Sequence, residues 1–184
     1  MNGITDTGTV TLQTARLTLR PFTRADAEEV YKSWASLSEV TEFLSWRPHS
    51  SPKVTIDLVD TWVHQYKFRT TYNWCIELSC DKGNRLAGNI AVTRRGDSSA
   101  ELAYLIAPRF WGMGLASEAV RAVCSHLFET VGYSAVLLRI PAENKKSRRV
   151  AEKCGFTLSG VTNNAATNHR GESLNLAEYS LSRM

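Results

Sequence analysis

One central segment limits the folds open to this chain more than any other. The alternating run AELAYLIA, residues 100–107, predicts a strand that ends at Pro108. After a turn that contains glycine, apolar residues recur at every fourth position over 115–131 and predict a helix. AVLLRI, residues 135–140, is almost wholly apolar and predicts a buried strand. Two strands joined through a helix in this way are normally parallel.

The strands that precede this unit are expected to be antiparallel. YNWCIELS (72–79) and RLAGNIAVT (85–93) alternate or run apolar, and the segment CDKGN between them is typical of a hairpin turn. Residues 100–107 would then be the third strand of a meander. An antiparallel meander joined to a parallel pair predicts an α+β fold with a mixed sheet.

The rest of the chain adds strands and helices around that sheet. Thr23 followed by Asp26 resembles a capping box with a shorter acid, and it predicts the start of a helix. In chain order, the remaining elements are a strand over 11–22, the helix that begins at Thr23, a helix around 59–66, a helix from Asn144 to Gly155, and strands over 156–162 and 173–182. We expect one domain over 9–184, preceded by a loose tail over 1–8.

Composition excludes several classes of protein. The 184 residues carry a formal charge of +4, well short of the dense basic stripes of nucleic-acid-binding proteins. No apolar run reaches the length of a membrane span, and the first residues are polar, so we expect a cytoplasmic protein without membrane contact. The four cysteines form no CxxC pair and the four histidines no HxxxH pair, which predicts that there is no metal site.

The turn before the 115–131 helix has the features of an anion site. Gly112 and Gly114 allow close approach to the backbone, and the helix start presents free N–H groups. A P-loop needs Gly-Lys-Ser/Thr, where this chain has Leu115, Ala116 and Ser117. A dinucleotide-binding loop is a near match, but this loop comes late and follows a meander. A turn that only reverses the chain is the remaining alternative.

A further sequence pattern distinguishes among these kinds of turn. Arg109-Phe-Trp-Gly112-Met-Gly114 has the form Arg/Gln-x-x-Gly-x-Gly/Ala and resembles the pyrophosphate loop of the GNAT superfamily of N-acetyltransferases. WGMGLASEA resembles the form found in the RimJ/RimL group, which acetylates protein N-termini. The resemblance covers nearly the whole chain, through RLTLRPFTRADAEEVY, AELAYLIAPRFWGMGLASEA and PAENKKSRRVAEKCGF in that order.

The resemblance implies a GNAT fold with about seven strands and about four helices, splayed between the two parallel strands 102–106 and 136–140. It also implies acetyl-CoA as donor, a primary amine as acceptor and direct attack in a ternary complex. The acceptor would be a protein N-terminal α-amine or a small-molecule amine. The implied contacts with acetyl-CoA are Leu105, Ile106, Ala107, Arg109, Trp111, Gly112, Met113, Gly114, Leu115, Ala116, Asn144, Lys145, Ser147 and Arg148.

The acid that protonates the departing thiolate does not follow the commonest family pattern. Many GNAT enzymes carry a tyrosine where this chain has Ala151. RimL-type enzymes use a serine three residues after an asparagine, and Asn144 and Ser147 have that spacing. Ser147 is therefore the candidate acid, and Asn144 a cofactor contact.

The base and the acceptor site are less determined by the sequence. Glu101 is the candidate base, with His49 and Glu172 as alternatives. Trp46 and His49 lie in the segment that, by resemblance, borders the acceptor. A non-catalytic acyl-CoA-binding module of the same fold stays an alternative to an enzyme, and the sequence leaves open whether the chain forms a homodimer.

Overall fold

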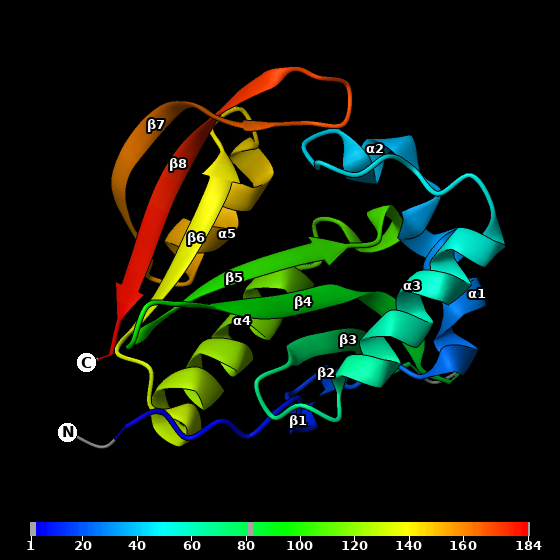
Figure 1. The fold of residues 1–184 in the computed structure, drawn as a ribbon, viewed down its shortest axis with the longest axis horizontal. Helices are drawn as coiled ribbons and strands as arrows, with labels where there is room; N and C mark the ends of the chain where they lie inside the picture. Colours follow the sequence, from blue (N-terminus) through cyan, green and yellow to red (C-terminus); the bar gives the residue numbers. More distant parts are fainter. Residues whose placement is uncertain (1–2, 81–82, 184) are drawn as a thin grey trace.

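The computed structural model describes residues 3–80 and 83–183. Its centre is one mixed sheet in the order β1-β2-β3-β4-β5-β6-β8-β7 (Figure 1). The strands are β1 Leu12–Gln13, β2 Leu17–Arg20, β3 Tyr72–Leu78, β4 Arg85–Arg95, β5 Ser99–Ile106, β6 Ala135–Pro141, β7 Thr157–Thr167 and β8 Ser173–Ser182. Every neighbouring pair is antiparallel except β5 and β6, which are parallel. The predicted α+β fold with a mixed, mostly antiparallel sheet is confirmed.

Helices cover both faces of this sheet, with α4 and α5 on one face and α1 and α3 on the other (Figure 1). They are α1 Ala27–Val30, α2 Ser38–Thr41, α3 Pro52–Gln65, α4 Leu115–His126 and α5 Lys145–Lys153. Both α1 and α4 continue into a π-helical turn. Within the described residues, no helix combines the length and the apolar character needed to cross a lipid bilayer.

Alternation along each strand divides the apolar side chains between two cores. On β3, Trp74 and Ile76 point to the α4 face and join Leu115, whereas Cys75 points to the opposite face. That second core is formed with Trp34 from the π-helical turn after α1 and with side chains from α1 and α3. Because strand side chains alternate with a period of two, both faces of this sheet can be buried by one apolar run.

The parallel pair is splayed, as the resemblance implied. β5 and β6 pair only over Ser99–Glu101 and Ala135–Leu137, and they diverge beyond that point. Residues 102–106 of β5 therefore keep β4 as a neighbour on one side and lose β6 on the other. Figure 1 shows β5 and β6 starting side by side and diverging toward their arrowheads.

The predicted strand over 11–22 is wrong in one respect, because the structure has two strands there, β1 and β2, joined by a turn. At that turn the Leu17 N–H donates to the Thr14 Oγ1 at 2.8 Å, and the Arg16 N–H donates to the Glu118 carboxylate at 2.9 Å. The local alternation of apolar residues continues through the turn and so does not predict it. The turn depends on a contact with Glu118, which is distant in the sequence. Helix α2 was not predicted either, since its four residues are too short for a periodic pattern.

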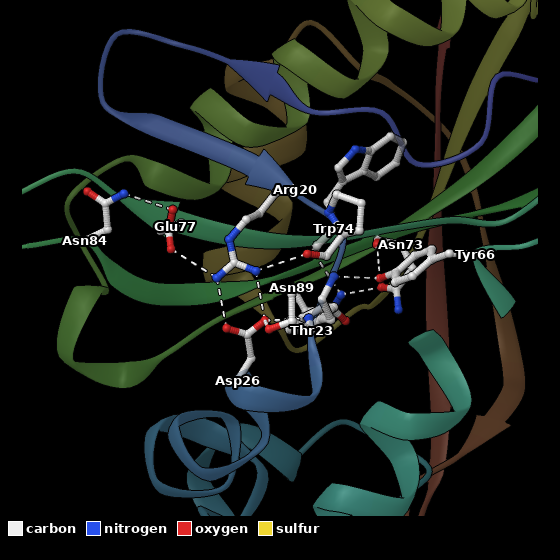
Figure 2. A network of polar contacts seen from close by, with 11 residues as sticks. Arg20, Thr23, Asp26, Tyr66, Asn73, Trp74, Glu77, Asn84 and Asn89 are labelled. Carbon is white, nitrogen blue, oxygen red and sulfur yellow. Dashed lines mark hydrogen bonds and ion pairs between the residues drawn. The ribbon is translucent and has the colours of Figure 1, made fainter. Parts of the chain in front are cut away.

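A polar network holds the start of α1 against the sheet (Figure 2). The Arg20 guanidinium donates two hydrogen bonds to the Asp26 carboxylate, at 2.8 and 2.9 Å, and a third to Glu77 at 3.1 Å. The Thr23 N–H donates to the same Asp26 carboxylate at 2.7 Å, which confirms the predicted capping box. The Tyr66 hydroxyl connects α3 to the sheet by donating to the Asn73 carbonyl at 2.7 Å.

The loose tail over residues 1–8 stays a prediction. In the described part of that segment, the Thr5 N–H donates to the Val131 carbonyl at 2.8 Å and the Thr7 N–H to the Tyr72 hydroxyl at 3.0 Å.

Candidate active site

The turn between β5 and α4 forms a backbone cradle. Gly112 and Gly114 have φ values of +80° and +77°, a region that L side chains rarely adopt. Gly114 is the N-cap of α4, and the first hydrogen bond of the helix runs from the Glu118 N–H to its carbonyl at 3.2 Å. The preceding N–H groups, those of residues 115–117, point out of the helix start without a helical acceptor. A Cβ on Gly112 would meet nothing within 4 Å, so the backbone there faces open space.

Glu118 and Arg16 brace this cradle. The Glu118 carboxylate accepts from the Thr14 hydroxyl at 2.6 Å and from the Arg16 Nε at 2.7 Å. Arg16 also donates to the Met113 carbonyl at 3.0 Å, inside the turn itself. The sequence reasoning missed Arg16. Glu118 belongs to the WGMGLASEA motif, so the sequence marked it as a residue of interest. The sequence did not indicate that Arg16 is its partner.

The Arg109 side chain lies away from the cradle. Its guanidinium donates to the Glu29 carboxylate at 2.6 Å and to the Leu86 carbonyl at 3.2 Å, and it stacks over the Phe110 ring. Hydrogen bonds to Arg109 and Ser33 together outweigh the effect of burial and hold the pKa of Glu29 below its ordinary value. This pair attaches the turn to α1, and a direct contact of Arg109 with a phosphate stays a prediction.

Trp111 connects the turn to both sides of the splay. Its indole N–H donates to the Ile106 carbonyl at 2.7 Å, at the end of β5. The Lys146 Nζ of α5 lies over the same ring, 4.2 Å from its centre. Trp111 therefore places the start of α5 next to the cradle, a role that the sequence did not reveal.

The resemblance implied contacts from Leu105, Ile106 and Ala107, and the backbone groups of these three residues face different neighbours. The Ala107 N–H donates to the Ala87 carbonyl of β4 at 2.8 Å, and a Cβ on Gly88 would lie 2.1 Å from the Leu105 carbonyl oxygen. Leu105 and Ala107 thus direct their polar groups toward β4. Because backbone groups alternate along a strand, those of Tyr104 and Ile106 face the splay.

Two hydroxyl groups meet at the start of α5. The Asn144 Oδ1 accepts from the Ser147 N–H at 3.0 Å and caps the helix. The Ser147 Oγ lies 2.6 Å from the Tyr104 hydroxyl, which comes from the splayed part of β5. Tyr104 was missed because its alternation with Leu102 and Ile106 predicts only a core position.

The remaining predicted residues of α5 point in different directions. Lys145 is exposed. Arg148 donates to the Tyr179 hydroxyl at 3.1 Å and to the Ala142 carbonyl at 3.2 Å, and so it anchors α5 to β8. Ser147, in contrast, forms its side-chain hydrogen bond with the splayed part of β5.

Glu101 lies on the other face of the sheet and at the closed end of the splay. It is paired with Leu137 in the parallel ladder. Its carboxylate accepts from the Arg95 Nε at 2.9 Å and lies 4.0 Å from the Arg139 Nη1. The structure therefore does not bring Glu101 together with Ser147.

The segment that borders the expected acceptor site is held to α3 and to the π-helical turn that follows α1. The His49 N–H donates to the Ala35 carbonyl at 2.8 Å, and its Nδ1 lies 2.8 Å from the Thr55 Oγ1. The Trp46 and His49 rings are 5.5 Å apart. Burial lowers the pKa of His49, so its imidazole is neutral at pH 7 and able to accept a proton.

The turn between β7 and β8 closes over this segment, as Figure 1 shows near α2. The His169 N–H donates to the Leu44 carbonyl at 2.9 Å, and the Asn168 Nδ2 to the Glu42 carbonyl at 3.2 Å. Asn168 is 4% exposed and also donates to the Glu172 carboxylate at 2.7 Å. We call these contacts of residues 168–169 with residues 42–44 the clasp. Glu172, an alternative base in the sequence, is engaged by Asn168 and Arg170.

A metal site was not expected from the sequence. In residues 3–80 and 83–183, no group of three His, Cys, Asp or Glu side chains is arranged to hold a metal ion.

Sequence comparison places the chain among acetyltransferases. The family model described as "Acetyltransferase (GNAT) domain" matches residues 16–157. An uncharacterized N-acetyltransferase of Bacillus subtilis (strain 168), YoaA, is 31% identical over 152 residues, which are 82% of this chain and 84% of that protein.

Solved structures share the fold. The acetyltransferase MccE, a microcin C7 self-immunity protein solved with acetyl-CoA and AMP, has a TM-score of 0.82 at 19% identity over 92% of this chain and 94% of its own. The ribosomal-protein-S5-alanine acetyltransferase from Vibrio fischeri has a TM-score of 0.80 at 15% identity, with coverages of 94% and 96%. Ribosomal-protein N-acetyltransferase-like proteins are thus among the similar proteins, which agrees with the resemblance to the RimJ/RimL group. The chain belongs to the GNAT acetyltransferase family and is an acyltransferase of the N-acetyltransferase type.

Proposed function

We propose that the protein transfers an acetyl group from acetyl-CoA to a primary amine, by direct attack in a ternary complex. The acceptor class is a protein N-terminal α-amine or a small-molecule amine. The observation that carries the proposal is the splay between β5 and β6, with the backbone cradle of residues 112–117 at its open end and the Ser147 hydroxyl beside it.

The cradle suits the pyrophosphate of CoA. Its free N–H groups and the positive end of the α4 dipole favour an anion, and Gly112 leaves the approach open. Bound acetyl-CoA would supply a thioester whose acyl carbon is open to attack. The Tyr104 backbone groups and the Ile106 N–H face the splay and would hold the arm that carries this thioester, while the Ile106 carbonyl accepts from the Trp111 indole.

The candidate acid and the candidate bases lie on opposite faces of the sheet. Ser147 lies on the α4 and α5 face, whereas His49 and Glu101 lie on the α1 and α3 side. An amine approaching from the α1 side would attack while Ser147 stabilises the leaving sulfur from the other side. Glu101 stays the proposed base from the sequence, and neutral His49 is favoured as its competitor by the lowered pKa of the imidazole.

The test of this function is binding followed by turnover. In isothermal titration we expect acetyl-CoA to bind the wild type, and Gly114→Ala to weaken binding at least about tenfold because a side chain is strained at a positive φ and obstructs the cradle. Gly96→Ala is the matched control, since Gly96 has φ +65° and lies in the turn between β4 and β5. A thiol-release assay across small amines and peptides with free N-termini then identifies the acceptor. No binding by the wild type, or no thiol release with any amine, would contradict the proposal.

The clasp is expected to shape the acceptor site. Asn168→Ala removes the side-chain contacts with Glu42 and Glu172, so we expect faster hydrogen exchange at the His169 amide and an acceptor KM raised about fivefold, for a loss of about 1 kcal/mol. The Kd for acetyl-CoA should not change. Ser159→Ala, on the same hairpin but with an exposed hydroxyl, is the control. If hydrogen exchange and the acceptor KM were both unchanged in Asn168→Ala, the clasp would have no role in shaping the acceptor site.

A further inference from the structure

We propose that Tyr104 is a positioning residue for Ser147, and that the two hydroxyls act as a pair that stabilises the negative charge of the departing sulfur. The inference rests on the proposed function and adds a residue to it. Neither the sequence pattern nor the commonest arrangement of the family assigns this role to a β5 residue.

The geometry of the pair is well defined. The Tyr104 side chain leaves β5 on the α4 and α5 face, in the part of the strand that has lost β6 as a neighbour. Its hydroxyl oxygen lies 2.6 Å from the Ser147 Oγ and 3.3 Å from the Ser147 carbonyl oxygen. Ser147 itself is fixed through the cap formed by Asn144. The pair therefore joins the splayed part of β5 to the first turn of α5.

Either hydroxyl has a proton to donate, and the proposal requires that Tyr104 donates to the Ser147 Oγ. Burial raises the pKa of Tyr104 to about 12, although the hydrogen bond with Ser147 opposes this, so the phenol keeps its proton at neutral pH. When Tyr104 donates that proton to the Ser147 Oγ, the hydroxyl proton of Ser147 is left to point elsewhere. A serine that both accepts from a phenol and donates outward is a stronger hydrogen-bond donor than an isolated one.

The position of the pair fits the departure from the family pattern. The usual tyrosine would project from position 151, one turn beyond Ser147 on α5, and this chain has the fully buried Ala151 there. The structure supplies a phenol from the neighbouring strand instead. Tyr104 and Ala151 belong to the same apolar cluster, so the phenol lies in the environment that a tyrosine at 151 would enter.

The step balances without consuming either hydroxyl. A C–N bond forms between the amine and the acyl carbon, the C–S bond breaks, and its electron pair stays on sulfur. Ser147 donates a hydrogen bond to that sulfur, with Tyr104 donating to Ser147. One proton leaves the amine nitrogen to solvent or to the base, and one proton from solvent converts the thiolate to the thiol.

The test uses CoA itself and needs no acceptor. The pKa of the bound CoA thiol is obtained from thiolate absorbance in a pH titration, and free CoA titrated in the same buffer gives the reference pKa. In the wild type we expect the pKa of the bound thiol to be lowered by about one unit, because the pair stabilises the thiolate. Tyr104→Phe and Ser147→Ala should each remove most of this shift. The double variant should lose little more, because the two residues act through one interaction.

The control is Tyr133→Phe, which removes a buried phenol at the other end of β6 and should leave the shift intact. In turnover, Tyr104→Phe should lower kcat about tenfold with the KM for acetyl-CoA unchanged. A wild-type thiol with an ordinary pKa, or a shift that survives in Tyr104→Phe, would overturn this inference alone. Failure of CoA to bind the wild type would overturn the proposed function together with it.

Discussion

Gly88→Ala is expected to lower the free energy of unfolding by about 3 kcal/mol, measured by urea denaturation. A Cβ at this position of β4 would lie 2.1 Å from the Leu105 carbonyl oxygen and 3.1 Å from the Ile106 Cα. Both atoms belong to the backbone, so they cannot move aside as a flexible side chain would. The two strands must separate at Leu105 and Ile106, in the part of β5 that no longer pairs with β6. We therefore expect weaker acetyl-CoA binding in addition to lower stability.

Gly160→Ala is the matched control for this substitution. Gly160 also lies within a strand, β7, but a Cβ there would meet nothing within 4 Å. We expect a change in the free energy of unfolding of less than about 1 kcal/mol in that variant. If Gly88→Ala were as stable as Gly160→Ala, the close approach of β4 and β5 would not constrain the fold.

Asp26→Ala is expected to cost about 3 kcal/mol at pH 7, because it leaves the partly buried Arg20 guanidinium without its bidentate partner and removes the cap at Thr23 (Figure 2). Asp57→Ala is the control, since Asp57 forms an exposed ion pair with Lys53 on α3. Pairs of that kind contribute about 0.5 kcal/mol or less. Equal stability of the two variants would contradict a structural role for the network.

The same variant should change the response to acid. Burial raises the pKa of Asp26, but hydrogen bonds from Arg20 and Thr23 outweigh it, so that the pKa in the folded protein lies below the ordinary value of 3.8. The stability that this carboxylate contributes is therefore fully present above about pH 4 and is lost as the pH falls through the folded value. Acid unfolding curves should show a steeper loss below pH 4 in the wild type than in Asp26→Ala. Parallel curves would contradict the lowered pKa.

Local patterns were sufficient for most of the architecture. The patterns in 72–79, 85–93 and 100–107 predicted β3, β4 and β5. The spacing of apolar residues over 115–131 predicted one helix, which the structure divides into α4 and a π-helical turn. These patterns work because burial on one face of an element repeats with the period of that element. The capping box at Thr23 was equally predictable, since its partners lie within one turn.

The candidate site was predictable only in part. Gly112, Gly114 and the start of α4 form a cradle whose shape depends on neighbouring residues in the chain. The direction of the Arg109 side chain depends on Glu29, eighty positions away. The turn between β1 and β2 likewise depends on Glu118, so the alternation around it predicted a single strand.

The sequence by itself determined most of the order of strands and helices, the mixed sheet and the turn with two glycines before α4, because each rests on the periodicity or conformational freedom of adjacent residues. Only the tertiary structure decided which polar groups meet. The sequence predicts Tyr104 as a core residue and Ser147 as a residue in the first turn of a helix. Their hydroxyl oxygens lie 2.6 Å apart because β5 and β6 diverge beside α5. Divergence of two strands is a property of the whole sheet, and the pairing of those hydroxyls follows from it.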